Sequence, residues 1–164
     1  PIQMGSAKLA STVIGALASA GLPANRLELE ITESVMMQNT EATLAALHQL
    51  RQLGVKISMD DFGTGYSALS YLRLFPFDKL KIDRCFIDDL TNEAALAIVR
   101  AVATMAKSLG MVTTAEGVET AEQLDHVRLL GCGEVQGYYI SKPMPIEMVA
   151  RVIEDYAPLL AKSA

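Results

Sequence analysis

Residues 55–65 have the sequence Val-Lys-Ile-Ser-Met-Asp-Asp-Phe-Gly-Thr-Gly. Apolar side chains alternate with polar ones over the first five residues, which predicts a β-strand. Two aspartates and a glycine-rich turn close this strand. The preceding residues 41–53 are rich in Ala and Leu and stop at Gly54, a common signal for the end of a helix. The segment therefore predicts a helix followed by a strand that ends in carboxylates.

The same alternation of helical and strand-like segments extends in both directions along the chain. The expected strands are residues 26–31, 55–59, 79–82, 111–115 and 134–136. The expected helices are residues 7–20, 41–53, 67–74, 93–109, 120–130 and 145–156. Strands separated by helices indicate parallel pairing through crossover connections, so we predict an α/β fold of one helix followed by five βα units.

The length of the chain allows two architectures for these five units. A complete (β/α)8 barrel takes about 250 residues, whereas this chain has 164. Five units fit either about five-eighths of a TIM-type barrel or a complete doubly wound sheet. The spacing of the segments does not decide between the two.

The composition indicates a folded domain rather than a disordered chain. Hydrophobic residues make up 51% of the chain and charged residues 20%, enough for one domain, or part of one, with a sizeable core. The formal net charge of −5 argues against non-specific binding to DNA or RNA. No apolar run reaches the roughly 18 residues that a membrane span needs, so we expect no membrane contact by this segment.

The cysteines and the first residue bear on location and completeness. Cys85 and Cys132 form no metal-ligand or redox motif, which favours a cytoplasmic location. The chain starts at Pro1, without an initiator Met or a signal peptide, so we expect it to be a piece of a longer protein. That parent protein could carry a membrane anchor elsewhere.

Every expected strand finishes close to side chains that could bind a metal or move a proton. These are Glu30 and Glu33, Asp60 and Asp61, Lys81 and Asp83, Glu116 and Glu119, and Gln136. In parallel α/β folds the carboxyl ends of the strands converge on one rim, where catalytic groups collect. Carboxylates gathered there repel one another without cations, and oxygen ligands favour Mg²⁺ or Mn²⁺ over Zn²⁺. We therefore predict a divalent-metal site at this rim.

Each of these residues also has an ordinary structural explanation when it is taken alone. Glu30 could be a solvated charge at a strand end, and Asp60 and Asp61 could cap a turn. Glu116 could be an acidic residue at the start of a helix. Lys81 lies between two apolar residues of its strand and so points away from their face. In a barrel that direction is the interior, where a lysine is costly unless it has a role.

Five segments of the chain resemble the EAL-domain family of cyclic-di-GMP phosphodiesterases. They are residues 28–34 (ELEITES), 60–67 (DDFGTGYS), 79–83 (KLKID), 115–120 (AEGVET) and 136–143, where Gln136-Gly137-Tyr138 precedes Lys142-Pro143. The segments occur in the order and with the spacing of the family. The resemblance extends from Ile2 to Ala157.

The resemblance implies a TIM-type (β/α)8 barrel that hydrolyses cyclic-di-GMP to linear pGpG, by in-line attack of water with two divalent cations, Mg²⁺ or Mn²⁺. Four carboxylates resemble its metal ligands: Glu30 for the first metal, Asp60 for both, and Asp61 and Glu116 for the second, with Glu116 also a candidate general base. Lys81 resembles the lysine that holds the attacking water, and Gln136 the glutamine that positions it. Support for the loop and the substrate site would come from Glu33, Phe62, Gly63, Thr64, Gly65, Asp83, Glu119 and Pro143.

One part of the family pattern does not occur in the chain. The Glu-Ala-Leu segment, whose glutamate is a further metal ligand in the family, is absent from residues 1–164. We therefore expect the chain to be the C-terminal part of one EAL domain, truncated at its N-terminal side, forming a partial barrel that lacks three βα units. The first metal would keep only Glu30 and Asp60 of its protein ligands, so we expect this fragment alone to be inactive. Open sheet edges would favour a homodimer or other self-association.

Two other functions remain open at this point. A non-catalytic receptor for cyclic-di-GMP, or a protein-interaction module, would keep the fold without hydrolysis, although the presence of Asp60, Asp61, Lys81 and Glu116 favours an active parent domain. A different metal-dependent α/β enzyme could use the same rim.

Overall fold

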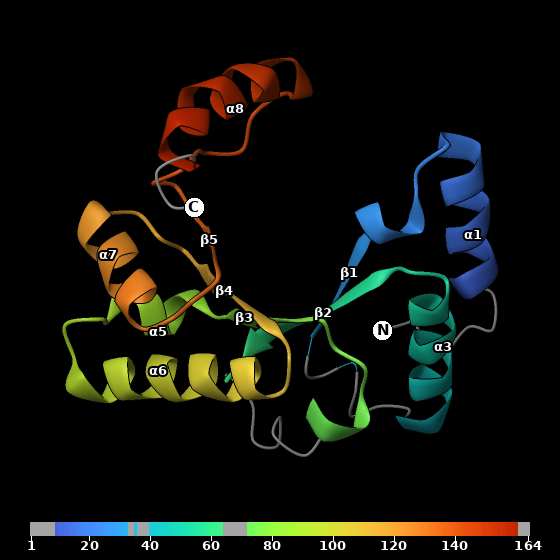
Figure 1. The fold of residues 1–164 in the computed structure, drawn as a ribbon, viewed down its shortest axis with the longest axis horizontal. Coiled ribbons are helices and arrows are strands. Elements are labelled where there is room, and N and C mark those ends of the chain that lie inside the picture. Colours follow the sequence, from blue (N-terminus) through green and yellow to red (C-terminus); the bar gives the residue numbers. More distant parts are fainter. Residues whose placement is uncertain (1–8, 33–34, 36–39, 64–71, 161–164) are drawn as a thin grey trace.

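The computed structural model describes residues 9–32, 35, 40–63 and 72–160, and its centre is one parallel β-sheet (Figure 1). Its strands are β1 (Glu28–Thr32), β2 (Lys56–Phe62), β3 (Lys79–Ile82), β4 (Val112–Glu116) and β5 (Glu134–Gln136). They lie in the order β1-β2-β3-β4-β5, and every neighbouring pair is parallel. The five expected strands are confirmed, with two differences of more than one residue in their bounds. β1 starts at Glu28 rather than at Arg26, and β2 continues beyond Met59 to Phe62.

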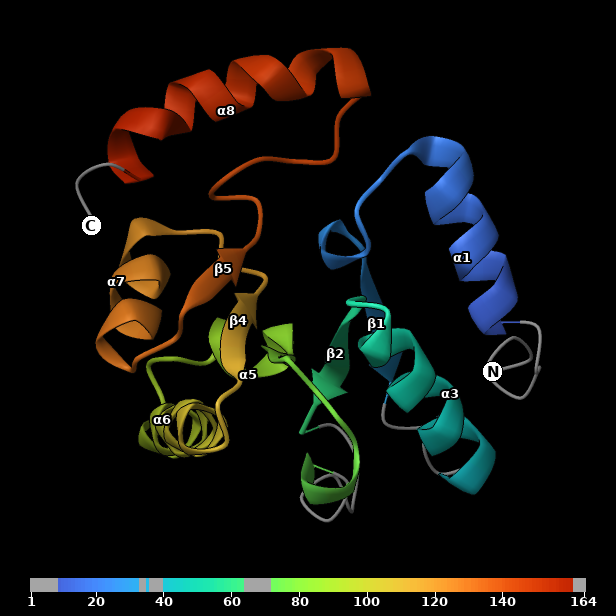
Figure 2. The same cartoon turned by 45° about the vertical axis from the view of Figure 1, so that its right-hand side comes forward.

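The order of the strands decides between the two architectures. A doubly wound sheet reverses its strand order at a switch point, so its helices cover both faces. Here the order follows the chain without a reversal, and right-handed crossovers then place the connecting helices on one face. Figure 2 shows a curved sheet with these helices outside it. The fold is therefore α/β of the TIM-barrel type, as expected.

The helices agree with the expected pattern, with two short additions. They are α1 (Leu9–Ala20), α3 (Thr40–Gln52), α5 (Arg84–Asp88), α6 (Glu93–Ser108), α7 (Ala121–Leu129) and α8 (Ile146–Leu160), with the 3-10 helix η1 (Ala24–Arg26). The additions α5 and η1 are too short to show a helical period in the sequence. Most of the expected helix 67–74 lies outside the described residues. In the described part of the chain no helix is both long and apolar enough to cross a membrane.

The two faces of the sheet differ in chemistry because side chains alternate along each strand. α6 packs against β3 and β4, and α3 packs against β2. The sheet residues buried in the core are apolar ones such as Ile57, Met59, Leu80, Ile82 and Ala115, none more than 1% exposed. The alternate residues point to the opposite face, which we call the inner face.

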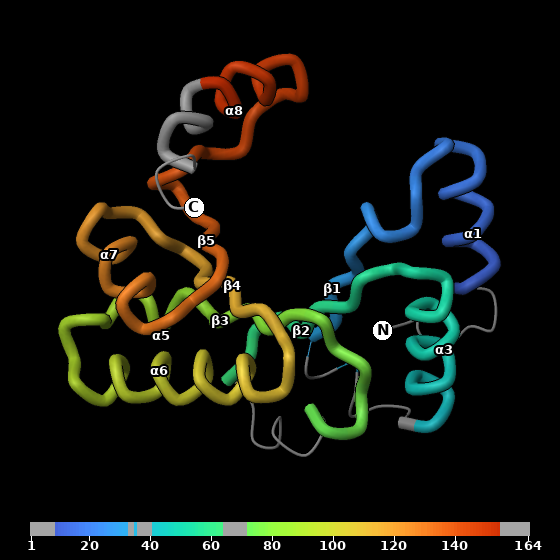
Figure 3. The backbone as a smooth tube through the Cα atoms, viewed as in Figure 1, coloured from blue at the N-terminus to red at the C-terminus, as the bar shows by residue number. Residues whose placement is uncertain are grey.

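The two ends of the sheet are open within the described residues. There β1 pairs with β2 alone, and β5 pairs with β4 alone. Figure 3 shows α1 and α3 at the β1 end of the sheet, whereas α8 lies apart from it, joined to β5 by residues 137–145. On α8, Ile146 and Ile153 are 77% and 62% exposed. Among the residues that the structure describes, β1 and β5 therefore each have one edge without a partner strand, and α8 exposes apolar side chains.

Gly137 fixes the loop after β4 against the end of β5. The Val118 N–H donates to the Gln136 carbonyl at 3.1 Å, and the Tyr139 N–H donates to the Val118 carbonyl at 2.9 Å. A Cβ atom on Gly137 would overlap the backbone nitrogen and oxygen of Val118. The close approach of the two backbones therefore requires glycine at this position.

We expect Gly137→Ala to lower the free energy of unfolding by about 1–3 kcal/mol, the usual cost of overpacking. Gly15 of α1 is the matched control, because nothing lies within 4 Å of a Cβ atom built there. Gly15→Ala should raise the free energy of unfolding by up to about 1 kcal/mol, because alanine has the higher helix propensity. Urea unfolding followed by circular dichroism measures both. Equal effects of the two substitutions would contradict the steric explanation.

Candidate metal centre at the carboxyl ends of the strands

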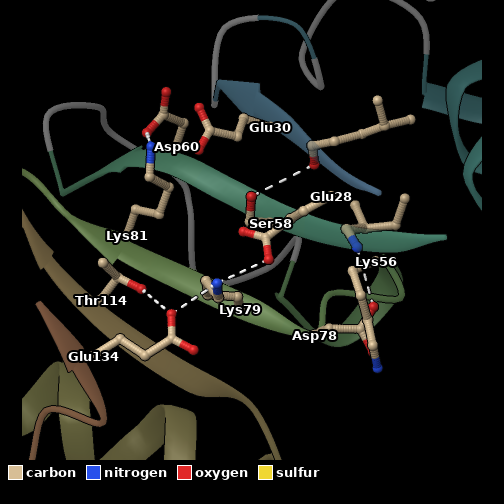
Figure 4. Close-up of polar contacts among 12 residues, drawn as sticks. Glu28, Glu30, Lys56, Ser58, Asp60, Asp78, Lys79, Lys81, Thr114 and Glu134 are labelled. Atoms are coloured by element: carbon tan, nitrogen blue, oxygen red, sulfur yellow. Dashed lines mark hydrogen bonds and ion pairs between the residues drawn. The ribbon is translucent and has the colours of Figure 1, made fainter. Parts of the chain in front are cut away.

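Lys81 of β3 lies on the inner face of the sheet among carboxylates of three other strands. The residues on either side of it are buried in the apolar core, so the alternation of the strand turns Lys81 the other way. The Lys81 side chain is 7% exposed. Its Nζ lies 2.8 Å from Glu30 Oε1, 2.9 Å from Asp60 Oδ1 and 2.8 Å from Glu116 Oε1. Figure 4 shows Lys81 with Asp60 and Glu30.

The surrounding carboxylates keep Lys81 positively charged. Burial disfavours the ammonium form, but hydrogen bonds with Glu116, Glu30 and Asp60 outweigh burial and raise the pKa of Lys81 above its usual value. At neutral pH Lys81 is therefore a fixed cation rather than a proton donor or base.

An irregularity in β2 brings two consecutive aspartates to the same region. In the pairing of β2 with β3, Asp60 and Asp61 together stand opposite the single residue Lys81. An extra residue of this kind is a β-bulge, which changes the direction of the side chains. Asp61 has a φ of 56°, in the left-handed region that few non-glycine residues adopt. In a regular strand Asp60 and Asp61 would point to opposite faces of the sheet, and the bulge removes that constraint.

Asp60, Asp61 and Glu116 form a group that suits a divalent cation. Carboxylate oxygens of the three residues lie within 4.8 Å of one another. Burial raises the pKa of Asp61, and the neighbouring Asp60 carboxylate raises it further. Burial also raises the pKa of Glu116, against the opposing effect of Lys81. Lys81 therefore offsets only part of the effect of burial on these two carboxyl groups. An oxygen-only donor set of this kind fits Mg²⁺ or Mn²⁺.

Other expected site residues lie around this group rather than in it. Gln136 is exposed at the end of β5, opposite Glu116 in the strand register. Asp83 is the N-cap of α5 and accepts a hydrogen bond of 2.8 Å from a backbone N–H of that helix. Glu119 Oε1 lies 2.9 Å from Nη1 of Arg84. Asp83 and Glu119 thus hold the segments that follow β3 and β4.

The other residues expected to support the loop and the substrate site differ in their surroundings. Phe62 is buried in the core. Gly63 has a φ of 99°, and a Cβ atom there would lie 2.9 Å from the Phe86 ring, so this position requires glycine. Pro143 is exposed and lines a pocket of about 410 Å³ with Gln136. Glu33, Thr64 and Gly65 lie outside the described residues.

Sequence reasoning missed two features of the inner face and the rim. Lys79, two residues before Lys81, contacts Glu28 and Glu134 in a second layer. The period-two alternation of β3 could have found it, because both lysines lie on one face. Arg84 binds Glu119, and its side chain fills the space where Gly117 would carry a Cβ atom. No spacing in the sequence predicts that the Arg84 side chain packs against Gly117.

Comparisons of sequence agree with this geometry. The family model of the EAL domain matches residues 1–143. The chain is 46% identical over 154 residues to the cyclic di-GMP phosphodiesterase NbdA of Pseudomonas aeruginosa, a match that covers 93% of this chain and 20% of NbdA. It is 49% identical over 162 residues to the uncharacterized protein y4lL of Sinorhizobium fredii, covering 98% of this chain and 20% of y4lL. The chain spans about a fifth of the length of the curated relatives it matches.

Solved structures give the same result. The PaMucR phosphodiesterase in complex with c-di-GMP has a TM-score of 0.85 and 43% identity, covering 90% of this chain and 60% of that one. The Klebsiella pneumoniae BlrP1 manganese/cy-diGMP complex at pH 9.0 has a TM-score of 0.79 and 33% identity, covering 84% of this chain and 36% of that one. The family match spans most of the chain and includes the strands that carry the carboxylates. This chain belongs to the EAL-domain family, which includes cyclic-di-GMP phosphodiesterases.

Proposed function

We propose that this chain provides the metal-binding rim of a domain that hydrolyses cyclic-di-GMP to linear pGpG. The observation that carries the proposal is the group of Asp60, Asp61 and Glu116 oxygens within 4.8 Å, beside the Lys81 ammonium. PaMucR and BlrP1, which share the fold, are cyclic-di-GMP complexes, and the BlrP1 complex contains manganese. Their ligands match what this donor set would bind.

The carboxylates would divide the metals between them. In this proposal Asp61 and Glu116 would hold one divalent cation, Mg²⁺ or Mn²⁺. Glu30 would hold the other, and Asp60 would serve as a ligand for both. Such a pair of cations, when bound, lowers the pKa of bound water and neutralises charge on the phosphate. The geometry supports the roles of Asp60, Asp61 and Glu116, because their carboxylate oxygens lie within 4.8 Å of one another.

Lys81 and Gln136 would act on the water and the phosphate. The three contacts of the Lys81 ammonium hold it on the inner face, where it can orient the attacking water and stabilise developing negative charge. Gln136, opposite Glu116, can position the same water. Pro143 supports the substrate site through the pocket that it lines beside Gln136.

We also propose that residues 1–164 form the C-terminal part of one EAL domain and work in the cytoplasm. The two open edges of the described sheet, the 60% coverage of the PaMucR chain and the missing Glu-Ala-Leu segment support the first point. The free thiols of Cys85 and Cys132 support the second. Homodimerisation through the open edges is part of the same proposal.

Mn²⁺ should bind the chain through this group. Asp61→Asn should weaken binding roughly 10–100-fold, because affinity depends on the number of charged oxygen ligands. Protons compete with Mn²⁺ for the same carboxylate oxygens. Because the pKa values of Asp61 and Glu116 are raised above their ordinary values of 3.8 and 4.5, this competition extends to a higher pH. Mn²⁺ affinity therefore rises as the pH rises through the raised values. Calorimetry at several pH values measures both effects. Asp88→Asn, at an exposed aspartate paired with Arg84, is the control, and equal affinity in the two variants would refute the assignment of Asp61.

Lys81→Met should reduce hydrolysis of cyclic-di-GMP at least about 100-fold. Because residues 1–164 lack the Glu-Ala-Leu segment, we expect little hydrolysis from the chain alone. The assay therefore also uses a chimera in which the N-terminal part of an EAL domain with that segment precedes this chain. Release of pGpG is followed by chromatography, with Lys56→Met as the control. Cyclic-di-GMP binding without any hydrolysis by the chimera would instead indicate a receptor.

The chain should associate with itself. Unpaired strand edges and exposed apolar side chains are buried together at a gain of about 25 cal/mol per Å² of apolar surface. Light scattering after size exclusion should give a mass above that of the monomer, increasing with concentration. Ile153→Glu, on the exposed side of α8, should lower that mass, whereas Glu154→Gln should not. A monomer at every concentration would contradict the proposal.

A further inference from the structure

A second polar layer lies beneath the metal centre on the same face of the sheet. Each strand has a polar residue two positions before its site residue, and side chains two apart share a face. The pairs are Glu28 and Glu30, Ser58 and Asp60, Lys79 and Lys81, Thr114 and Glu116, and Glu134 and Gln136. Figure 4 shows the second layer running across the strands beside Lys81.

Lys79 is the centre of this second layer. Its side chain is 19% exposed, and its Nζ lies 2.8 Å from Glu28 Oε2 and 2.8 Å from Glu134 Oε2. The Thr114 hydroxyl donates to the same Glu134 oxygen at 3.0 Å. One ammonium on β3 therefore connects β1 with β5, the two end strands of the described sheet.

These contacts favour a curved sheet. Neighbouring strands lie about 4.8 Å apart, so β1 and β5 would each lie about 10 Å from β3 in a flat sheet. Glu28 and Glu134 nevertheless both lie 2.8 Å from the Lys79 ammonium. Turning both end strands toward the inner face shortens the two spans together, and Figure 2 shows this curvature.

Stability alone does not account for a charged layer here. The interior of a TIM-type barrel is usually filled with branched apolar side chains. Ion pairs with partly exposed partners contribute little, and Glu28 and Glu134 are 31% and 48% exposed. Apolar side chains of similar volume in place of buried ion pairs are often neutral or stabilising. The layer is better explained by the geometry that it imposes.

We propose that Lys79 is a positioning residue for the metal centre. By binding Glu28 and Glu134 together it holds β1 and β5 at the curvature that brings Glu30 and Gln136 to the site. That the positioned side chains bind a metal rests on the proposed function. The effect of Lys79 on the contacts of Lys81 does not depend on it.

The test compares Lys79→Met, Lys79→Arg and Lys56→Met in the intact chain. Methionine keeps the length of the side chain and removes both ion pairs, whereas arginine can keep them. Lys56 is the matched control because it lies on β2, is 51% exposed and pairs with Asp78 Oδ1 at 3.6 Å, at the other end of the strands (Figure 4).

Two measurements separate the positioning role from the proposed function. The NMR signal of the Lys81 ammonium group gives the exchange rate of its hydrogens with water, which reports on its contacts without any metal. Calorimetry gives the affinity for Mn²⁺. Lys79→Met should speed the exchange and weaken Mn²⁺ binding, each on the order of 10-fold, a size usual for residues of one ion-pair network. Lys79→Arg and Lys56→Met should leave both within about twofold.

The direction in which the exchange rate and the Mn²⁺ affinity change distinguishes a positioning role of Lys79 from a direct effect of its charge. Removal of a nearby cation would strengthen the pairing of Lys81 with its carboxylates and raise the affinity for Mn²⁺. Faster exchange in Lys79→Met, restored in Lys79→Arg, therefore supports positioning, and unchanged or slower exchange overturns it. If the unmodified chain binds no Mn²⁺, the proposed metal centre fails, and the exchange rate still decides the role of Lys79.

A second variant covers the case in which Lys79→Met does not fold. That failure would follow from two carboxylates left without a cation. The triple variant Glu28→Met, Lys79→Met and Glu134→Met removes the three charges together. Faster exchange at Lys81 in the folded triple variant supports the proposal, and exchange as in the unmodified chain overturns it.

Discussion

The contact between the Lys81 ammonium and the carboxylates of Glu30, Asp60 and Glu116 is the interaction on which the rest of the site depends. Carboxylates this close repel one another, and burial strengthens that repulsion. Lys81 offsets it from β3, the middle strand of the described sheet, and so reaches carboxylates on both sides. The strand order that distinguishes a barrel from a doubly wound sheet is therefore also what allows one lysine to assemble the site.

The single charge of Lys81 does not balance the negative charge of all the surrounding carboxylates. The stability of the fold is therefore linked to the binding of a divalent cation. The pKa values of Asp61 and Glu116 are raised despite the presence of Lys81. A carboxyl group whose pKa is higher in the folded chain than in the unfolded chain reduces stability at neutral pH. That loss is recovered as the pH falls through the raised pKa. A divalent cation bound at the proposed site would supply the same relief at neutral pH without protonation, so that cation binding and folding would favour each other.

The sequence predicts most of the fold and the main members of the site, but not how they are joined. Alternation of apolar residues locates all five strands, and the acidic residues at their ends indicate a common rim. The choice between barrel and doubly wound sheet depends on the direction of each crossover, which no local pattern contains. The elements α5 and η1 are too short for periodicity to reveal, and the roles expected for Glu33, Thr64 and Gly65 concern residues outside the described part of the chain.

The residues that local rules misplace are those closest to the chemistry. Strand periodicity alone would send Asp60 and Asp61 to opposite faces, and only the pairing of β2 with β3 reveals the bulge that brings their oxygens near Glu116. Asp61 reaches this position with a left-handed backbone that costs free energy. A strand under selection for stability alone would avoid both the bulge and the charges. Their presence together at the end of β2 agrees with the proposed metal site, where local stability would be given up for the geometry of the ligands.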